Sequence, residues 1–301
     1  MTNAPRTGHT PTPTDPVFIG GVFKSGTSLL RVMLGRHPHI ASGLETYWFD
    51  LPWPGLGETQ HMLPEPVRRP IAPLPEQLDR LARFYEIPLP DVERMANAAG
   101  TPEAFLDEFL SAYAARCGKL RWLEKTPGNV LHLDRLYGHW PRAKVIHIIR
   151  HPLDVFASAK EAGKWDTPEV FGTIWTAFFG AVEDAKQSGL ATDNRLLEIR
   201  YETLVQDPEA TMRAVLSFLG ERWDPAVARH DGDRSDYEKV LAVSGKASTT
   251  LERLGDPISD SRIGIWRTIV SADERAALQS LADDAGVGKR YRQLADEGTD
   301  A

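Results

Sequence analysis

The chain has 301 residues, with 35 lysines and arginines against 42 aspartates and glutamates, so its formal net charge is −7. This acidic balance excludes a sequence-independent nucleic-acid binder, which needs a basic surplus to displace counterions from phosphates. Hydrophobic residues make up 42% of the chain and charged residues 26%, a composition typical of folded globular proteins and not of disordered ones. The length suffices for a full-sized core in one or two domains.

The chain carries few signals of targeting or of metal binding. A single cysteine, Cys117, excludes an intrachain disulfide and a cysteine-based metal site, and the nine histidines show no HExxH spacing. Residues 1–16 are rich in proline and threonine and lack an apolar stretch, so we expect a disordered leader and not a secretory signal. No run approaches the roughly 20 apolar residues of a membrane span. We therefore expect a cytoplasmic protein with no metal, membrane or nucleic-acid partner.

Strand and helix patterns alternate from residue 17 onward. Short apolar runs rich in β-branched residues predict strands at 17–22, 120–123, 144–149 and 195–199. Helical patterns occupy 27–34, 75–117, 130–140, 153–162, 168–188, 208–220 and 272–285. This order predicts an α/β fold in which helices flank both faces of a parallel sheet. We expect one domain over 17–296, with a lid or acceptor-binding segment near 45–75 and a loose tail that ends in 297–301.

The segment between the first strand and the first helix, GVFKSGTS (21–28), is a candidate anion site. Backbone N–H groups at such a turn and at the helix N-terminus attract phosphates. Gly21 and Gly26 have the G-x4-G spacing of a P-loop, but Thr27 stands where a nucleoside-triphosphate P-loop has its lysine, and the lysine is displaced to Lys24. The P-loop-like strand–loop–helix therefore predicts a different phosphorylated ligand.

Two segments in order resemble the sulfotransferases that use 3′-phosphoadenosine-5′-phosphosulfate (PAPS). FKSGTSLLRVML resembles their 5′-phosphosulfate loop, and KVIHIIRHPLDVFASAK resembles their 3′-phosphate segment with Arg150 and Ser158. An arginine at a strand end suits a phosphate dianion. RYETLV (200–205) and SRIGIWR (261–267) resemble further family segments, so that the likeness covers about 17–270. It implies PAPS as donor, PAP (3′-phosphoadenosine-5′-phosphate) as product, no metal, and a donor site made of Lys24, Ser25, Gly26, Thr27, Ser28, Arg150, Ser158, Tyr201 and Arg262.

Sulfuryl transfer to a hydroxyl needs a base for the acceptor and cations at the leaving phosphate. The cytosolic branch of the family uses a histidine in a Lys-Thr-His stretch, whereas the comparable stretch here, starting at Lys125, reads Lys-Thr-Pro. SGTSLLRVMLGRHPHIASGLETYW resembles, without gaps, the start of tyrosyl-protein sulfotransferases, which implies Glu45 as the general base. The resemblance further implies Lys24 as a cation at the leaving phosphate and Lys125 as one at the sulfonate.

Several alternatives remain open at the level of the sequence. A P-loop kinase or NTPase is disfavoured by the missing lysine and by Arg150 at a strand end where a Mg²⁺ ligand is needed. A non-catalytic nucleotide-binding relative is a third class. The aromatic group at 47–53 either walls an acceptor pocket or anchors the lid. The acceptor could be a small molecule, a glycan or a peptide, and the oligomeric state stays undetermined.

Overall fold

The computed structural model describes residues 15–53, 72–246 and 249–296. The expected disordered leader up to residue 14, part of the expected lid (54–71) and the tail at 297–301 lie outside the described residues. The strands are β1 (Val17–Gly20), β2 (Ile40–Ser42), β3 (Arg121–Lys125), β4 (Lys144–Ile149) and β5 (Leu196–Arg200). They form one sheet in the order β2-β3-β1-β4-β5, and all four pairings are parallel, which confirms the predicted α/β fold.

Helices connect the strands and continue beyond the last of them. The α-helices are α1 (Thr27–Gly35), α2 (Leu74–Tyr85), α3 (Leu89–Ala99), α4 (Pro102–Arg116), α5 (Leu133–His139), α6 (Pro152–Glu161), α7 (Pro168–Gln187), α8 (Tyr201–Gln206), α9 (Pro208–Leu219), α10 (Ser235–Ser244), α11 (Thr249–Arg253), α12 (Trp266–Ile269), α13 (Ala272–Asp284) and α14 (Gly288–Asp296). Short 3-10 helices are η1 (Trp48–Asp50), η3 (Pro127–His132) and η4 (Pro225–Ala228).

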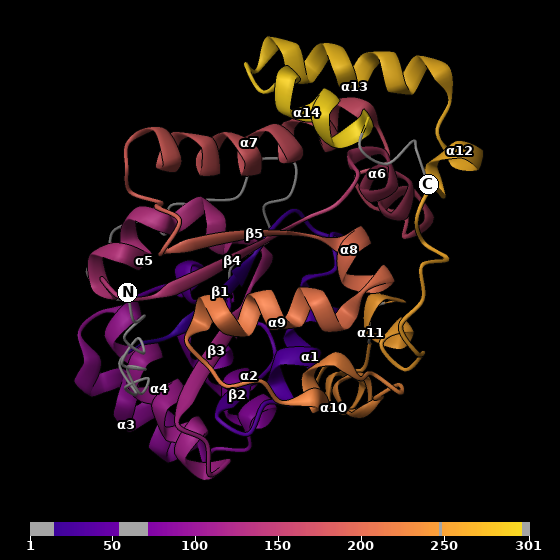
Figure 1. Cartoon of the computed structure of the whole chain (residues 1–301). Helices are drawn as coiled ribbons and strands as arrows, with labels where there is room; N and C mark the ends of the chain where they lie inside the picture. The colour runs from indigo at the N-terminus through magenta and orange to yellow at the C-terminus, as the bar shows by residue number, and fades with distance from the viewer. Residues whose placement is uncertain (1–14, 54–71, 247–248, 297–301) are drawn as a thin grey trace, which may run out of the picture.

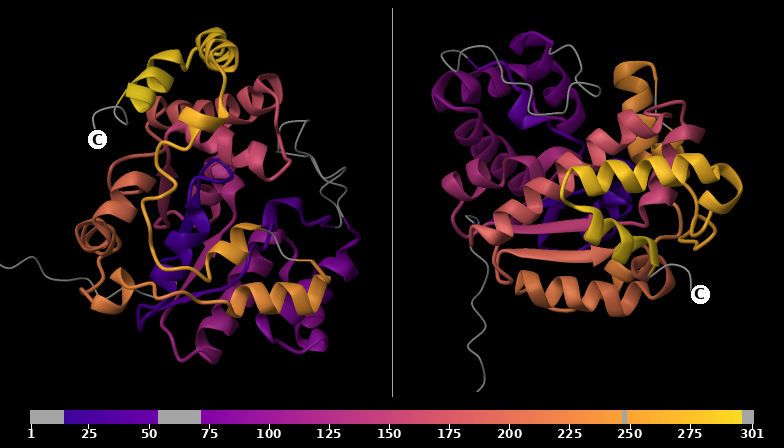
Figure 2. Two further views of the ribbon diagram at one scale, coloured as in Figure 1. Left: turned by 90° about the vertical axis from the view of Figure 1, so that its right-hand side faces the viewer. Right: turned by 90° about the horizontal axis from the view of Figure 1, so that it is seen from above.

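Helices cover both faces of the sheet, as predicted. In Figure 1 the sheet lies between α5 and α7 on one side and α1 and α9 on the other. Successive strand residues point to opposite faces, so Phe18 joins the core under α7 whereas Val17 and Ile19 pack with α1 and α9. The helices α13 and α14 lie together outside α7, and α2, α3 and α4 gather at one end of the molecule (Figure 2).

Several elements differ from their predicted form. The long helical pattern at 75–117 is three helices, because prolines and glycines interrupt it before α3 and α4. The helix expected at 130–140 begins as the 3-10 turn η3 at Pro127 and becomes α-helical only at Leu133. The chain after the helix predicted to end at 285 was expected to be loose, but Gly288–Asp296 forms α14, which packs on α13 and α6 and buries Tyr291 and Leu294. The strand β2 and the helices α8, α10, α11 and α12 were not predicted.

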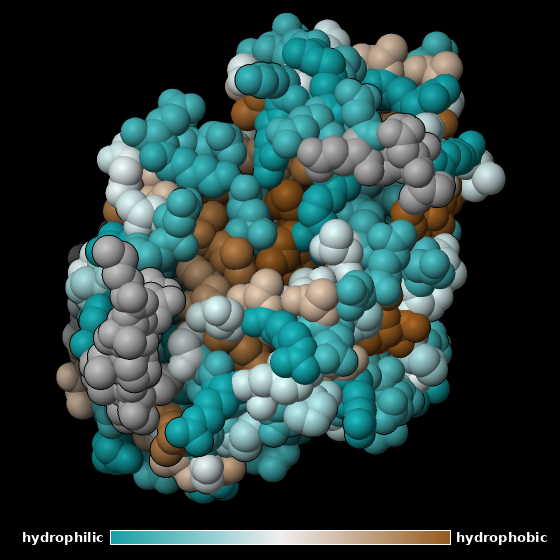
Figure 3. Space-filling view, viewed as in Figure 1, coloured by the Kyte–Doolittle hydropathy of each residue, from teal (hydrophilic) through white to brown (hydrophobic). Residues whose placement is uncertain are grey.

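Hydrophilic side chains predominate on the face seen in Figure 3, and apolar ones gather near its centre. Within the described part of the chain, no helix combines the length and the hydropathy that crossing a bilayer requires. The buried apolar residues of the described chain form two core clusters, one on either side of the sheet.

Candidate functional site

Each of the five strands delivers a predicted site residue at its carboxyl end. Lys24 follows β1, Glu45 follows β2, Lys125 ends β3, Arg150 follows β4 and Tyr201 follows β5. In a parallel sheet these ends share one edge, and ligands bind there at the point where the strand order reverses. That point is β1, which lies between β3 and β4. The fold therefore brings together residues that lie up to 177 positions apart in the sequence.

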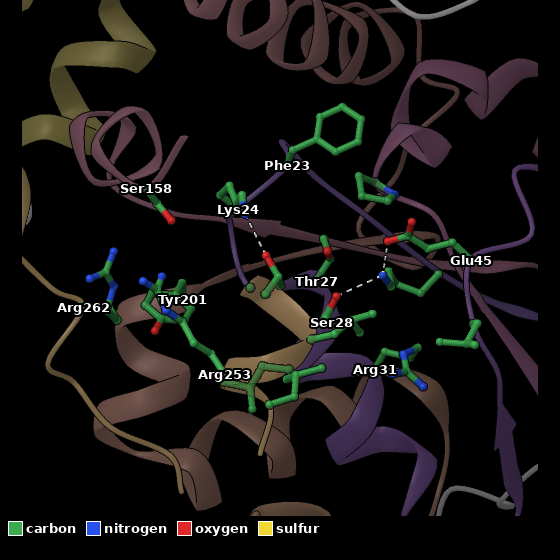
Figure 4. Close-up of a pocket in the computed structure, with 18 of the residues that line it drawn as sticks. Phe23, Lys24, Thr27, Ser28, Arg31, Glu45, Ser158, Tyr201, Arg253 and Arg262 are labelled. Carbon is green, nitrogen blue, oxygen red and sulfur yellow. Dashed lines mark hydrogen bonds and ion pairs between the residues drawn. The ribbon is translucent and has the colours of Figure 1, made fainter. Parts of the chain in front are cut away.

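All five residues line one cavity of about 860 Å³. In the view of Figure 4, Glu45 and Arg31 lie toward one end, Ser158 and Arg262 toward the other, and Thr27 and Ser28 between them. Gly26 also lines the cavity. Of the residues predicted for the site, Ser25 alone is not among those lining it. It is buried, and its backbone N–H closes the loop on the carbonyl of Val22 at 3.1 Å.

The loop before α1 has a backbone that depends on glycine. Gly26 has φ of 99°, and a Cβ added there would lie 2.6 Å from the Tyr201 ring. Lys24 also has a positive φ, 72°, a sparsely populated conformation for a non-glycine residue that recurs at ligand-binding sites. No side chain of the described residues caps the start of α1 at Thr27, so its first N–H groups are available to an anion.

The Lys24 ammonium faces the cavity from this loop. Its Nζ donates a hydrogen bond of 2.8 Å to Thr250 Oγ1, from α11 (Figure 4). Burial, together with the positive charges of Lys164, Arg253 and Arg262, lowers the pKa of Lys24 from its usual 10.5 to about 8. An anion placed among these four cations would relieve their mutual repulsion.

Lys125 and Glu45 form an ion pair at the other end of the cavity. Lys125 is 3% exposed, and it also donates to Ser28 Oγ at 3.1 Å, which ties the pair to the start of α1 (Figure 4). The second carboxylate oxygen of Glu45 accepts a hydrogen bond from the Tyr47 hydroxyl. Burial lowers the pKa of Lys125, and the Glu45 carboxylate opposes this shift. A carboxylate and a cation thus stand beside a helix N-terminus.

Arg150 is the most buried cation near the opposite end. Its guanidinium stacks over the Tyr201 ring, 4.5 Å from the ring centroid, and donates to the backbone carbonyls of Lys24 and Arg262. Arg150 is 5% exposed, and its Nε has no hydrogen-bond partner among the described residues. Ser158 lines the cavity from α6. A buried guanidinium with an unused donor fits a polyanionic ligand.

The segment that contains Arg262 is held across the cavity by α6. The Asp154 carboxylate accepts hydrogen bonds from the backbone N–H groups of Gly264 at 2.8 Å and Trp266 at 3.0 Å. The Arg262 side chain forms an ion pair with Glu161. Its main-chain carbonyl, and not its guanidinium, therefore meets Arg150 in this structure.

The cavity contains one buried cation that the sequence interpretation missed. Arg31 on α1 is almost fully buried, lines the cavity near Ser28 (Figure 4), and forms an ion pair with Asp236 of α10. Helical spacing could have found it, because Arg31 follows Thr27 by four residues and Ser28 by three and therefore shares their helix face.

The aromatic group after Glu45 divides between the core and the cavity. Trp48, Phe49 and Trp53 are buried in the core, so they anchor this segment to the body of the fold. Tyr47 lines the cavity. Three members of the group thus anchor the segment, and a contact of Tyr47 with the acceptor stays a prediction.

Among the described residues, His37, His39 and Glu221 are the group whose ligand atoms lie close enough to hold a metal, within 4.8 Å of one another. Their atoms are already used. His37 Nε2 donates to the Arg222 carbonyl and its Nδ1 accepts from the His39 backbone N–H, while Glu221 pairs with the buried Arg121. These contacts are structural ones.

Comparisons with known proteins agree with the family resemblance that the sequence shows. The model of the sulfotransferase family matches residues 16–225. Nodulation protein NoeE of Sinorhizobium fredii is 26% identical over 310 residues, which cover 94% of this chain and 68% of that protein. Protein-tyrosine sulfotransferase 1 of Danio rerio is 26% identical over 280 residues, covering 88% and 69%. The sulfotransferase domain of a Synechococcus olefin synthase superposes with a TM-score of 0.60 and 22% identity over 92% of this chain and 98% of that one.

The family model matches more than half of the chain, and the fold and the site at the strand ends agree with it. Together they define an enzyme class. The chain belongs to the sulfotransferase family. This membership confirms the resemblance seen in the sequence and decides against a nucleotide kinase or NTPase.

Proposed function

We propose that the protein transfers the sulfuryl group of PAPS to a hydroxyl group of an acceptor, with Glu45 as the general base. The observation that carries this proposal is the set of contacts Glu45–Lys125–Ser28, in which a carboxylate, a cation and the start of α1 meet in one cavity. The same cavity holds Lys24 and Arg150, which supply the positive charge that a nucleotide with two phosphate groups requires.

The residues present fit the donor. The buried Arg150 Nε that lacks a partner among the described residues, together with Ser158 and Tyr201, suits the 3′-phosphate end. The loop from Lys24 to Ser28, with uncapped N–H groups and a glycine too confined to carry a Cβ, suits the 5′-phosphosulfate. Arg262 would contribute through its backbone or after release from Glu161.

In the proposed reaction each charged side chain has one task. When bound, the donor supplies a sulfuryl group whose bond to the 5′-phosphate breaks as the acceptor oxygen attacks. The Glu45 carboxylate accepts the proton of the acceptor hydroxyl. Lys125 keeps positive charge beside the transferred group, and Lys24 with the N–H groups of α1 stabilises the charge that develops on the leaving phosphate.

Nucleotide preference tests the donor assignment. PAP is expected to raise the melting temperature strongly, whereas ATP with Mg²⁺ is expected to change it little. Replacement Arg150→Ala is expected to weaken PAP binding by about 1.5–3 kcal/mol, the scale of a charged hydrogen bond. Arg213→Ala is the matched control, because Arg213 lies on the exposed face of α9 with Glu209. Stabilisation by ATP with Mg²⁺ but not by PAP would contradict the assignment, and so would an unchanged affinity in Arg150→Ala.

A further inference from the structure

A second carboxylate, Glu124, lies immediately before Lys125 and points away from the cavity into the protein. It is fully buried and receives four hydrogen bonds. The Thr46 backbone N–H donates to Oε1 at 3.2 Å, and the Thr46 hydroxyl donates to the same oxygen at 2.8 Å. The Thr126 hydroxyl donates to Oε1 at 2.6 Å, and Asn129 Nδ2 donates to Oε2 at 2.6 Å. The Thr46 N–H and the Asn129 NH₂ group can only donate, so each oxygen of Glu124 accepts at least one hydrogen bond.

The orientation of the Asn129 amide is determined by its other partners. Its Nδ2 also donates to the Ile19 carbonyl at 2.9 Å, and its Oδ1 accepts from the Trp48 indole N–H at 3.0 Å. A carbonyl can only accept and an indole N–H can only donate, so the amide cannot be turned over. The buried network consequently requires a hydrogen-bond acceptor at both carboxylate oxygens of Glu124.

The network connects directly to the proposed base. Thr46, which Glu124 holds by two bonds, is the residue after Glu45, and the next residue, Tyr47, donates its backbone N–H to Thr126 Oγ1 at 3.3 Å. Tyr47 has a positive φ of 52°, and from this conformation its hydroxyl reaches back to the Glu45 carboxylate. Arg80 of α2 also holds this segment, because it donates to the carbonyls of Glu45 and Thr46 at 3.0 and 2.9 Å.

We propose that Glu124 is a positioning residue for the reaction: through Thr46 it sets the place of Glu45 beside Lys125. The inference rests on the proposed function of Glu45 as base. Because side chains alternate along a strand, Glu124 can hold the Glu45 segment inside the protein while Lys125, its neighbour on β3, meets the Glu45 carboxylate in the cavity. Two adjacent residues of β3 thereby fix both members of the ion pair. Placement errors of about 1 Å can cost about a hundredfold in rate.

Substitutions at Glu124 and Thr46 separate positioning from folding. Glu124→Gln keeps the shape but puts an NH₂ group against either Asn129 Nδ2 or the Thr46 N–H, and both are donors. It is expected to lower kcat about ten- to a hundredfold and to leave the Kd for PAP within twofold. Thr46→Val, which replaces the hydroxyl with a methyl group of similar size, is expected to lower kcat as well, whereas Thr46→Ser keeps the hydroxyl and is expected to have nearly the native kcat. Glu198→Gln is the matched control, since Glu198 is a strand glutamate of β5 that pairs with His147 and Lys186 instead of the base.

The decisive experiment is a double-mutant cycle with Glu45→Gln. PAP release from PAPS is followed by mass, with the best acceptor from a panel of a phenol, a tyrosine peptide and an oligosaccharide, and with water alone. If Glu124 acts through Glu45, Glu124→Gln lowers the rate of the native enzyme but causes no further loss in Glu45→Gln. Multiplicative losses, or a native rate in Glu124→Gln, overturn the positioning role. A native rate in Glu45→Gln instead overturns the base, and the positioning role with it.

Discussion

Two lysines face the same cavity with different amounts of uncompensated charge. Lys125 has the Glu45 carboxylate as its partner, whereas the Lys24 ammonium donates to the neutral hydroxyl of Thr250. Three cations surround Lys24, and the Glu161 carboxylate offsets them only in part. Removing the partner of a buried ion leaves an uncompensated charge, so each lysine depends on an anion nearby. For Lys125 this anion belongs to the protein. For Lys24 it would be the ligand.

This difference predicts a pH dependence of PAP binding. With a pKa of about 8, Lys24 is charged below pH 8 and loses its charge as the pH rises further. A bound anion favours the charged form, so the Kd for PAP is expected to be flat near pH 7 and to rise by up to about tenfold per pH unit above pH 8. In Lys24→Arg the cation keeps its charge, and the Kd is expected to stay nearly constant from pH 7.5 to 9.5. Calorimetric titration measures both, and an equal pH slope in the two proteins would exclude Lys24 as the titrating group.

At the scale of elements, the loop before α1 combines a backbone requirement with a packing requirement. Gly26→Ala would impose a side chain at φ of 99° and place its Cβ 2.6 Å from Tyr201. We expect Gly26→Ala to lower the free energy of unfolding by about 1–3 kcal/mol and to weaken PAP binding, since the loop can accommodate the methyl group only by moving. Gly100→Ala is the control, because Gly100 also has a positive φ, 71°, but no atom within 4 Å of the added Cβ. PAP binding as tight in Gly26→Ala as in Gly100→Ala would contradict this view of the loop.

Elements with a periodic apolar pattern could be predicted from the sequence, and those without one could not. β4 and α7 have long apolar runs and were predicted to within a residue or two at each end. β2 has only three residues, too few for an alternation to be visible. No residue of α10 is fully buried: Val240 and Val243 pack against the core only partly buried, and the polar contact Arg31–Asp236 also holds the helix, so its amphipathic signal is weak.

The same distinction applies to the candidate site. Lys24, Arg150 and Ser158 were predictable because each lies in a short motif that follows a strand. The Glu124 network was not, because its hydrogen bonds join residues that lie up to 110 positions apart, such as Asn129 and Ile19. Only packing of the whole sheet brings these residues together.

At the scale of the whole molecule, charge is distributed unevenly. The chain has a net charge of −7, yet two carboxylates and nine basic side chains line the cavity: Lys24, Arg31, Arg80, Lys125, Arg150, Lys164, Lys246, Arg253 and Arg262. The acidic total excludes a basic surface for nucleic acids, but it leaves room for one concentrated anion site. Basic side chains thus outnumber carboxylates in the cavity where the proposed donor binds, although acidic residues outnumber basic ones in the whole chain.

The stability of the whole fold depends on a buried histidine that is not part of the site. Both ring nitrogens of His132 lack a partner among the described residues, and burial lowers its pKa to about 3. Between pH 6.5 and 3 the unfolded chain therefore binds a proton that the folded protein does not, so stability falls as the pH falls, by about 1.4 kcal/mol per unit. His132→Leu is expected to remove this contribution. Urea unfolding at pH 6.5 and 4.5 measures it: the stability of the variant relative to the native protein should rise by about 2–3 kcal/mol, and a constant difference would contradict the assignment.

The central claim is that this cavity transfers a sulfuryl group with Glu45 as the base. The most direct measurement is the initial rate of label transfer from sulfur-labelled PAPS to the acceptor panel, in the native enzyme and in Glu45→Gln. The native enzyme is expected to label at least one hydroxyl acceptor, and Glu45→Gln to do so about a hundredfold or more slowly at nearly unchanged PAP affinity. Label transfer by Glu45→Gln at a rate near that of the native enzyme would contradict the claim.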